Sequence, residues 1–538
     1  MKADCIPFED TGYFSNIILD YLSEKSKMGP FYSYNPTING FKEAIEKRHF
    51  SDLNREILVE ALQGQYQKDS IKLKGDSPVT INMDLLLDSN TFSVTTGHQL
   101  CLFTGPLYFI YKIVSTVKLC KELSIQYPEQ NFVPVYWMAT EDHDFEEINH
   151  FKVEGKKFTW KTDQKGAVGR MKIAELKQVF DEFSDWLPEL SNNANELRQL
   201  FENTYLKHSN LAAATRYLVH QLFEYSGVII VDGDDKKLKT LFAPTAKREL
   251  IEQFSSEKVN EQSEKLSQNY KIQVNPREIN LFYLVDGLRE RIVKENTFYS
   301  VNDTSLTFTE DEILIELRDF PERFSPNVIL RPVYQESILP NLAYIGGGGE
   351  LAYWFQLKTA FDAVSIPLPV LILRNSVAWL NSKQSKVLAQ LDISNKQFFL
   401  KKEVLLKEWV KQNSSIDLEL KAQKVKSDEF FSSLRSLAGE LDASLNDHVA
   451  AIATKQSNAL AKLSEKMIRA ERRKSREAKN KIDFLKDNLF PNNGLQERTL
   501  NFSEIYLLHG KEMINILHDN FVVPANQFLI IQGKQTII

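Results

Sequence analysis

The sequence predicts an α/β protein whose core is a parallel β-sheet. Short apolar runs recur along the chain, a strongly helical segment separates the first two, and each run stops in polar or glycine residues. Apolar runs of this kind form strands that are buried on both faces of a parallel sheet. Ligands bind such sheets beyond the carboxyl ends of the strands. The pattern therefore predicts a fold and also the sheet edge where a site lies.

The first strand–helix–strand unit is expected between residues 91 and 139, with strands at 91–96 and 133–139. Gly105 and Pro106 are expected to start the helix, with Gly105 as its N-cap. Apolar side chains then repeat at helical spacing as one buried stripe: Leu107, Ile110, Tyr111, Val114 and Val117. The opposite face carries Tyr108, Lys112 and Ser115. This is the right-handed crossover that joins strands of a parallel sheet.

Later strands of the same sheet are expected at 227–232, 342–345 and 368–373. They end in Asp232, in four glycines at 346–349, and in Arg374 followed by Asn375 and Ser376. The stretches between them, about 151–225 and 255–330, read as insertions into a core that spans residues 1–380.

Residues 381–500 differ in character, because long stretches lack proline and glycine and their charges alternate in sign. Val449, Ile452, Gln456, Ala459 and Leu463 follow one another in alternating steps of three and four residues, and Ala470 lies seven residues further on, which is the spacing of a coiled-coil seam. We expect an antiparallel helical hairpin here, with the basic run 469–481 on a solvated face or, alternatively, in contact with a phosphate. Residues 501–538 then supply a helix and a strand that return to the core.

Composition narrows the classes of function. The net charge of −6 argues against a dedicated nucleic-acid binder, and no apolar run reaches the length of a membrane span. The N-terminal residues lack the apolar segment of a secretory signal. Three cysteines are too few for a disulfide framework, so a cytoplasmic setting is expected.

The first candidate site is the turn after the first strand, where His98 and Gln99 follow Gly97. Backbone donors at a helix start attract phosphate or carboxylate, and His98 could add a charge-assisted hydrogen bond. A histidine that merely caps the helix is the structural alternative.

The second candidate site follows the second strand, where Glu141, Asp142, His143 and Asp144 are consecutive. Crowded carboxylates repel one another unless a cation or an amine lies among them. A metal is the alternative: in a helix, His143, Glu147 and His150 would share one face and could serve a metal-dependent hydrolase.

The third candidate site is the glycine run 346–349. Successive glycines allow a ligand close to the backbone, and Glu350, Tyr353 and Trp354 follow on an expected helix. The run matches neither the dinucleotide-binding nor the P-loop pattern, so a tight turn is the alternative.

Taken in order along the chain, several motifs resemble the bacillithiol biosynthesis cysteine-adding enzyme family. The matching residues are Thr96-Gly97-His98-Gln99, Gly105-Pro106-Leu107-Tyr108 with Lys112, Val135-Tyr136-Trp137 through Glu141-Asp142-His143-Asp144, Glu147-Ile148-Asn149-His150, Leu330-Arg331-Pro332, Gly346-Gly347-Gly348-Gly349-Glu350 through Tyr353-Trp354, Arg374 with Ser376, and Phe490-Pro491 with Gly494-Leu495-Gln496-Glu497-Arg498.

The resemblance implies a Rossmann-like core related to class I aminoacyl-tRNA synthetases, with two connecting-peptide insertions and a coiled-coil arm that forms a homodimer. It also implies ligation of L-cysteine to the amine of glucosaminyl malate, giving bacillithiol in the last step of that pathway, with ATP as the activating cofactor. Partners would be these two small molecules, with neither nucleic acid nor membrane.

We therefore predict an amide-forming cysteine ligase without a metal site. His98 and Gln99 would orient a carboxylate or phosphate, and Glu141, Asp142 and Asp144, beside His143, would hold the sugar amine, one of them as a base. Arg331 and Arg374 would bind malate or phosphate. The remaining expected binding residues are Thr96, Gly97, Gly105, Tyr108, Lys112, Asn149, Gly346, Gly347, Gly348, Gly349, Glu350, Tyr353, Trp354 and Ser376. A nucleotide-binding coiled-coil scaffold is a second alternative.

Overall fold

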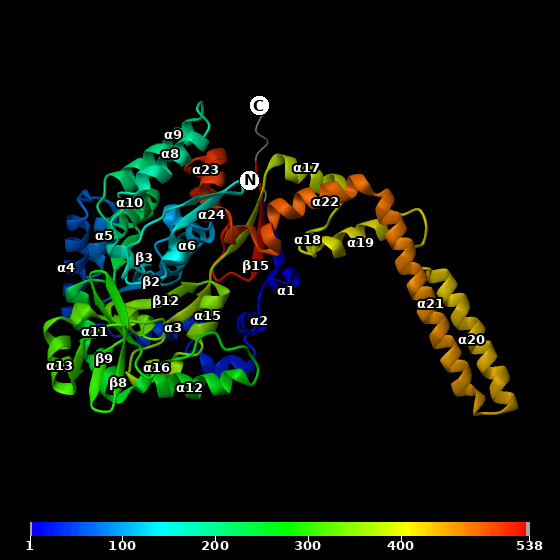
Figure 1. Cartoon of the computed structure of the whole chain (residues 1–538), viewed down its shortest axis with the longest axis horizontal. Helices are drawn as coiled ribbons and strands as arrows, with labels where there is room; N and C mark the ends of the chain where they lie inside the picture. The colour runs from blue at the N-terminus through cyan, green and yellow to red at the C-terminus, as the bar shows by residue number, and fades with distance from the viewer. Residues whose placement is uncertain (1–2, 534–538) are drawn as a thin grey trace.

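A five-stranded parallel sheet forms the core of the protein (Figure 1). The structure is a computed structural model and describes residues 3–533. The strand order is β13 (Val370–Leu373), β12 (Asn341–Gly346), β2 (Thr91–His98), β3 (Asn131–Met138) and β6 (Ile229–Asp232). Every pairing in this sheet is parallel, which confirms the predicted fold class.

Helix α6 (Tyr108–Gln126) connects β2 to β3, but it begins later than expected and is buried on both faces. Its N-cap position is Leu107 rather than Gly105, because a short 3₁₀ turn (Leu102–Thr104) precedes it. Gly105 has φ 59° and ψ −126°, a conformation that favours glycine. Lys112 and Ser115, on the face opposite the apolar stripe, are both buried as well.

The N-terminal region is mainly helical. Its elements are β1 (Ala3–Pro7), α1 (Phe8–Thr11), α2 (Asn16–Leu22), α3 (Ile38–Lys47), α4 (Asp52–Lys68) and α5 (Pro78–Leu85). Tyr21 of α2 donates a hydrogen bond to the carbonyl of Leu371 in β13, at 2.6 Å. These helices therefore pack directly against the core sheet.

Two groups of elements interrupt the sheet. Between β3 and β6 lie α7 (Phe145–Ile148), the hairpin β4 (His150–Val153) and β5 (Lys156–Thr159), and helices α8 (Leu176–Trp186), α9 (Asn192–Phe201) and α10 (Leu211–Phe223). After β6 come α11 (Lys236–Glu252), α12 (Phe254–Ser267) and an antiparallel sheet. That sheet comprises β7 (Leu281–Val285), β8 (Leu288–Glu295), β9 (Phe298–Val301), β10 (Thr307–Thr309) and β11 (Phe324–Pro326), with α13 (Glu310–Asp319) beside it. Helix α14 (Arg331–Ile338) then leads to β12, and α15 (Gly348–Trp354) and α16 (Lys358–Ala363) follow it.

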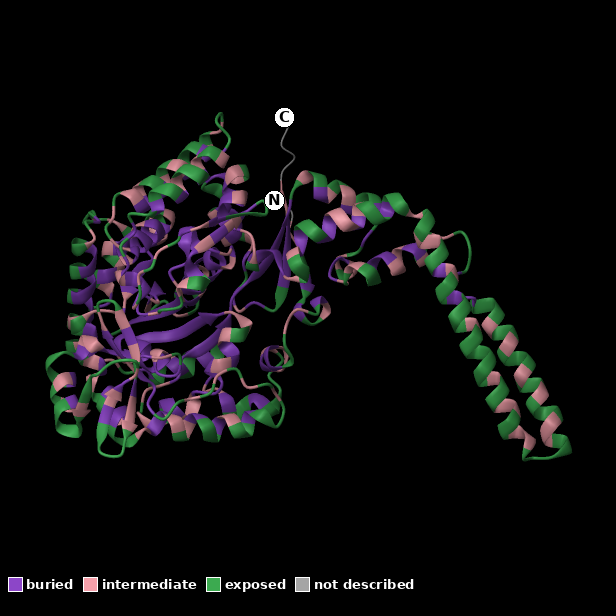
Figure 2. Ribbon diagram, in the orientation of Figure 1, coloured by how far each residue is buried: buried purple, intermediate pink, exposed green. Residues whose placement is uncertain are grey.

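A long helical arm projects from the core (Figure 1). It comprises α17 (Ser382–Leu391), α18 (Asn395–Phe398), α19 (Lys402–Asn413), α20 (Lys421–Leu441), α21 (Leu445–Lys474) and α22 (Arg476–Leu489). Helices α20 and α21 form the expected hairpin, and Figure 2 shows that it is largely solvent-exposed. Within residues 3–533, no helix is long and apolar enough to cross a bilayer.

The end of the chain returns to the core through a separate three-stranded sheet. β15 (Gln527–Gln532) pairs antiparallel with β1 and parallel with β14 (Ser376–Leu380). The single helix expected before β15 is in fact two, α23 (Phe502–His509) and α24 (Glu512–Asn520). They break at Gly510, whose φ of 55° with ψ of −147° does not continue a helix.

Candidate functional site

A cavity of about 600 Å³ lies at the carboxyl ends of β2, β3 and β12. Its lining combines acidic and basic side chains from different parts of the chain. The end of β2 and the segments after β2 and β3 supply His98, Gln99, Glu141, Asp142, His143 and Glu147. The antiparallel sheet, the loop before it and α14 supply Arg277, Arg289, Arg291 and Arg331. We call it the large chamber.

Gln99 joins two of the carboxylates in the large chamber. Its Nε2 donates to Asp142 Oδ2 and to Glu147 Oε2, each at 2.8 Å. Asp142 Oδ1 accepts from the backbone N–H groups of His143 (2.7 Å) and Asp144 (3.3 Å). One neutral amide thus bridges two like charges, which leaves this wall suited to a cationic ligand.

Glu141 is placed differently, because it forms a buried ion pair with Lys239 of α11. Lys239 also donates to the carbonyl of Phe324, at 2.8 Å. Burial raises the pKa of Glu141 above its ordinary value, and Lys239 opposes that rise. This carboxylate therefore already has a cationic partner within the protein.

His143 is oriented by Arg289. The Arg289 guanidinium donates to His143 Nδ1 at 2.6 Å, to Ser325 Oγ at 3.0 Å and to the carbonyl of Pro326 at 3.1 Å. A guanidinium has no acceptor, so His143 Nδ1 must be unprotonated and its proton lies on Nε2. Burial and the charge of Arg289 lower the pKa of His143, which favours this neutral form.

The basic side of the large chamber is the part that the sequence interpretation missed, apart from Arg331. Arg289 and Arg291 are two residues apart on β8, so they share one face of that strand. Arg331 is fixed by hydrogen bonds to Gln335 (3.1 Å) and Tyr353 (3.3 Å). A Cβ added at Gly97 would lie 3.2 Å from the Tyr344 hydroxyl oxygen, so glycine at this position permits the close approach of Tyr344.

His98 lines the large chamber but is not the charged group expected there. Burial and the nearby charge of Lys112 lower its pKa to about 4. Its Nδ1 lies 2.8 Å from the carbonyl oxygen of Gln99, which requires a proton on Nδ1 and leaves Nε2 as an acceptor. The charge-assisted hydrogen bond predicted for His98 is therefore corrected to a neutral contact at pH 7.

The lowered pKa of His98 predicts acid sensitivity. A histidine whose folded-state pKa lies below its unfolded value of about 6.5 favours the folded state above pH 6.5 and loses that contribution as pH falls toward 4. The difference between the unfolded pKa of about 6.5 and the folded pKa of about 4 corresponds to roughly 3 kcal/mol of unfolding free energy. We expect wild type to lose more unfolding free energy between pH 6.5 and pH 4 than His98→Asn, as measured by urea denaturation. Equal losses in both proteins would contradict this.

Several predicted binding residues lie outside the large chamber. Lys112 is buried, donates to the carbonyl of Gly97 and pairs with Glu350 at 2.6 Å, so it is committed within the protein. Glu350 itself lines the chamber with Tyr353 and accepts from Tyr344. Thr96 is buried and donates to the carbonyl of Ile345 at 2.8 Å. Asn149 and Trp354 are also buried, and Asp144 is exposed beside the chamber without lining it.

The glycine run also needs correction. Gly346 ends β12 and Gly347 is the N-cap of α15, so Gly348 and Gly349 are helical. None of the four lines the large chamber and none has a positive φ. The run is a strand-to-helix turn, the alternative stated above.

Arg374 and Ser376 form hydrogen bonds within the protein interior and do not face a ligand cavity. Arg374 donates to Glu497 at 2.7 Å, and Glu497 also accepts from Ser376 Oγ (3.2 Å) and from the backbone N–H of Val377 (3.1 Å). Arg374 is 4% exposed and Glu497 1%. The expected contact of Arg374 with malate or phosphate is thus replaced by a buried ion pair.

The helix expected to carry His143, Glu147 and His150 on one face does not form. Helix α7 covers only Phe145–Ile148, with His143 before it and His150 in β4. Among residues 3–533, no group of three or more His, Cys, Asp and Glu side chains is arranged to hold a metal ion. His143, Glu147 and His150 therefore do not share a helical face, and the interpretation as a metal-dependent hydrolase is wrong.

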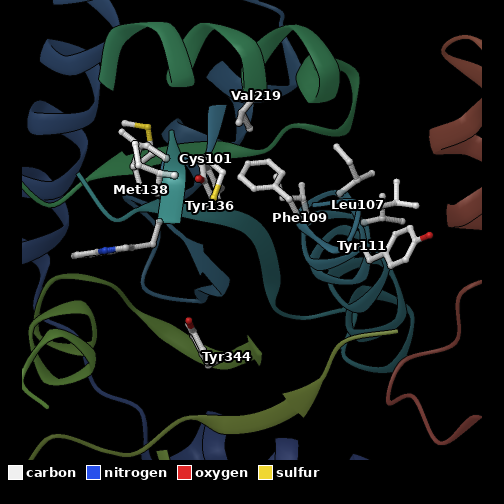
Figure 3. Close-up of a cluster of buried hydrophobic side chains, with 14 of the residues drawn as sticks. Cys101, Leu107, Phe109, Tyr111, Tyr136, Met138, Val219 and Tyr344 are labelled. Atoms are coloured by element: carbon white, nitrogen blue, oxygen red, sulfur yellow. The ribbon is translucent and has the colours of Figure 1, made fainter. Parts of the chain in front are cut away.

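An apolar cluster lies next to the large chamber. Figure 3 shows Cys101 close to Tyr136 and Met138 within this cluster. Burial raises the pKa of the Cys101 thiol to about 12. Cys101 is therefore a packing residue and not a thiolate nucleophile at neutral pH.

A parallel sheet with a polar cavity at the carboxyl ends of its strands defines a Rossmann-like ligand-binding protein. Residues 1–375 match the family model described as "Bacillithiol biosynthesis BshC, N-terminal Rossmann-like domain", and residues 377–532 match its "C-terminal coiled-coil domain". The chain belongs to this bacillithiol biosynthesis BshC family, which confirms the resemblance.

Curated relatives agree along nearly the whole chain. A protein of Flavobacterium psychrophilum named "Putative cysteine ligase BshC" is 49% identical over 99% of this chain and 100% of its own length. A protein of the same name from Flavobacterium johnsoniae is 48% identical over 96% and 97%. A crystal structure described as a "putative arginyl t-RNA synthetase" from Campylobacter jejuni covers 87% of this chain and 98% of its own, at 12% identity and a TM-score of 0.21. A TM-score of 0.21 is too low to establish a shared fold, so the relation to class I aminoacyl-tRNA synthetases stays a prediction.

Proposed function

We propose that this protein is a cysteine ligase that joins the carboxyl group of L-cysteine to the amine of glucosaminyl malate, the last step of bacillithiol biosynthesis. The observation that carries the proposal is the division of charge in the large chamber. Asp142 and Glu147, bridged by Gln99, offer a site for an amine. The four arginines offer sites for carboxylate or phosphate.

The acidic wall would bind and then activate the sugar amine. An ammonium group must lose a proton before its nitrogen can attack a carboxyl carbon. Asp142 is our candidate for this base, because backbone N–H groups fix one of its oxygens and Gln99 contacts the other. Once that first proton has passed from Asp142 to solvent, the nitrogen attacks and the new N–C bond forms. The phosphate-bearing leaving group of the activated cysteine departs from the carboxyl carbon with its electron pair, and the second amine proton passes to Asp142.

The basic side fits the phosphates of ATP, which would supply the energy for amide formation by activating the cysteine carboxyl group. Guanidinium groups bind phosphate bidentately, and Arg289 and Arg331 are already fixed by hydrogen bonds. The three cysteines are unpaired thiols, which suits a reaction in the reducing cytoplasm.

One incubation tests this function. Purified protein is mixed with cysteine, glucosaminyl malate and ATP, and product and nucleotide are followed by mass spectrometry. We expect bacillithiol to form with one ATP consumed per amide, and no product when any component is omitted. Hydrolysis of ATP without amide, or no reaction in any mixture, would overturn the proposal.

We also propose a homodimer formed through the α20–α21 hairpin. Large apolar side chains are exposed on it, including Phe430 (57%), Leu437 (66%) and Leu441 (84%) of α20. Their separations of seven and four residues place them on one face of the helix. A second copy of this hairpin is an occupant of matching length and chemistry.

Light scattering tests the dimer. We expect wild type at twice the chain mass of 62.0 kDa, and the double variant Phe430→Ser with Leu437→Ser near 62.0 kDa. Leu190→Ser is the control, because Leu190 is fully exposed but lies outside the arm. A monomeric wild type, or a double variant that stays dimeric, would contradict this assignment.

A further inference from the structure

A second, smaller cavity adjoins the large chamber. It has a volume of about 370 Å³, and we call it the small chamber. Gln99 and Glu147 line both chambers, so these two side chains form a shared wall. The small chamber is otherwise lined by Cys101, Gly105, Pro106, Tyr108, His150, Phe151, Lys152, Arg498 and Thr499. Two predicted binding residues, Gly105 and Tyr108, therefore belong here.

The small chamber carries unneutralised positive charge. Arg498 and Lys152 line it, and neither side chain forms an ion pair with any residue in the part of the chain that is described. Glu147 is the one carboxylate of the lining, and it lies on the shared wall where Gln99 already contacts it. A ligand group that fits this chamber is therefore anionic.

The Arg498 side chain is exposed, but the backbone that carries it is fixed by its neighbours on both sides. Gln496 hydrogen-bonds to the backbone N–H (2.8 Å) and carbonyl (3.1 Å) of Trp379. Asn501 donates to the carbonyls of Phe103 and Gly105, each at 2.7 Å. The N–H of Asn501 also donates to the carbonyl of Lys152, at 3.1 Å. The backbone segments that carry Arg498 and Lys152 are therefore joined in one hydrogen-bonded frame, which holds the bases of the two side chains near one another.

We propose that the small chamber binds the dicarboxylate aglycone of the acceptor sugar, with Arg498 and Lys152 pairing with its carboxylates. This inference rests on the proposed function and specifies how its acceptor is bound. In a 2-amino-2-deoxy-glycoside, the amine and the glycosidic oxygen are on adjacent carbons. An amine held at Asp142 and Glu147 therefore directs the aglycone past the shared wall into the small chamber. The cysteine and the nucleotide would then bind in the large chamber, next to its arginines.

The test compares two acceptors that differ only in the aglycone: glucosaminyl malate and methyl glucosaminide. For Arg498→Ala we expect KM for glucosaminyl malate to rise at least about tenfold, equivalent to about 1.4 kcal/mol, with kcat nearly unchanged. KM for methyl glucosaminide should not change. Arg498→Lys should recover part of the loss. Arg318→Ala is the control, because Arg318 is exposed like Arg498 but lies on α13 outside both chambers.

Calorimetric titration of glucosaminyl malate, without ATP or cysteine, separates this inference from the proposed function. Binding by wild type that weakens about tenfold in Arg498→Ala supports the inference even if no amide is ever formed. Ligation by wild type with the same KM in Arg498→Ala overturns the inference and leaves the ligase intact. An equal loss with both acceptors, or no binding by wild type, also overturns it.

Discussion

Asp142→Asn lowers kcat/KM for amide formation by about 10²–10⁴-fold, the range measured when a general base is removed. The substitution keeps the shape of the side chain and an oxygen that can accept the backbone N–H groups of His143 and Asp144. What it removes is the negative charge that would attract the ammonium group and the site that would receive its proton. Initial rates of bacillithiol formation, followed by mass spectrometry, give the change directly.

Two variants on α7 make this result interpretable. Glu147→Gln removes the second carboxylate bridged by Gln99 and should also lower kcat/KM. Glu146→Gln is the matched control, because Glu146 is on the same helix but outside both chambers. A similar loss in the control, or full activity of Asp142→Asn with an unchanged Tm, would remove Asp142 from the proposed chemistry.

Arg374→Met costs about 3–5 kcal/mol of unfolding free energy, because it leaves the carboxylate of Glu497 buried without a cation. Glu497 is 1% exposed, so water does not replace the lost guanidinium. Chemical denaturation, with the midpoint and Tm compared between variants, measures the loss.

The double variant Arg374→Met with Glu497→Gln should recover most of that loss. It removes both charges but keeps an acceptor for the N–H of Val377, and replacing a buried ion pair by neutral groups is often close to neutral. Arg318→Ala breaks an exposed pair with Asp319 and should cost at most about 1 kcal/mol. A small effect of Arg374→Met, equal to that of Arg318→Ala, would contradict the importance of the buried pair.

The strand-end rule explains which parts of the site could be predicted. Parallel strands place their carboxyl ends along one edge, so the turns after β2 and β3 were expected to meet, and His98, Gln99 and Asp142 do line one cavity. Arg331 precedes β12 and is brought to the same edge by α14. The apolar runs are sufficient to place His98, Gln99 and Asp142 at one edge, because they show where each buried strand ends, whereas Arg331 was expected from the family resemblance.

Charge at a strand end does not reveal whether its partner is a ligand or another residue. Arg374 meets Glu497, which is 123 positions away, and Lys112 meets Glu350 across the sheet. Arg374 was expected to bind a ligand because guanidinium groups pair with carboxylate and phosphate, and Lys112 because it belongs to a family motif. Their true partners are distant in the sequence, so the sequence alone does not reveal them. The opposite error left out Arg289: the alternation of β8 shows which side chains share a face but not which cavity that face borders.

The pairing of β1 with β15 has a consequence for synthesis on the ribosome. Residues 3–7 are synthesised well before residues 527–532, which are their strand partner within residues 3–533. At about 5–20 residues per second, β1 must wait roughly half a minute to two minutes for that partner. We therefore expect the three-stranded sheet to close only after β15 has been synthesised, so that nascent chains carry an unpaired strand available to chaperones.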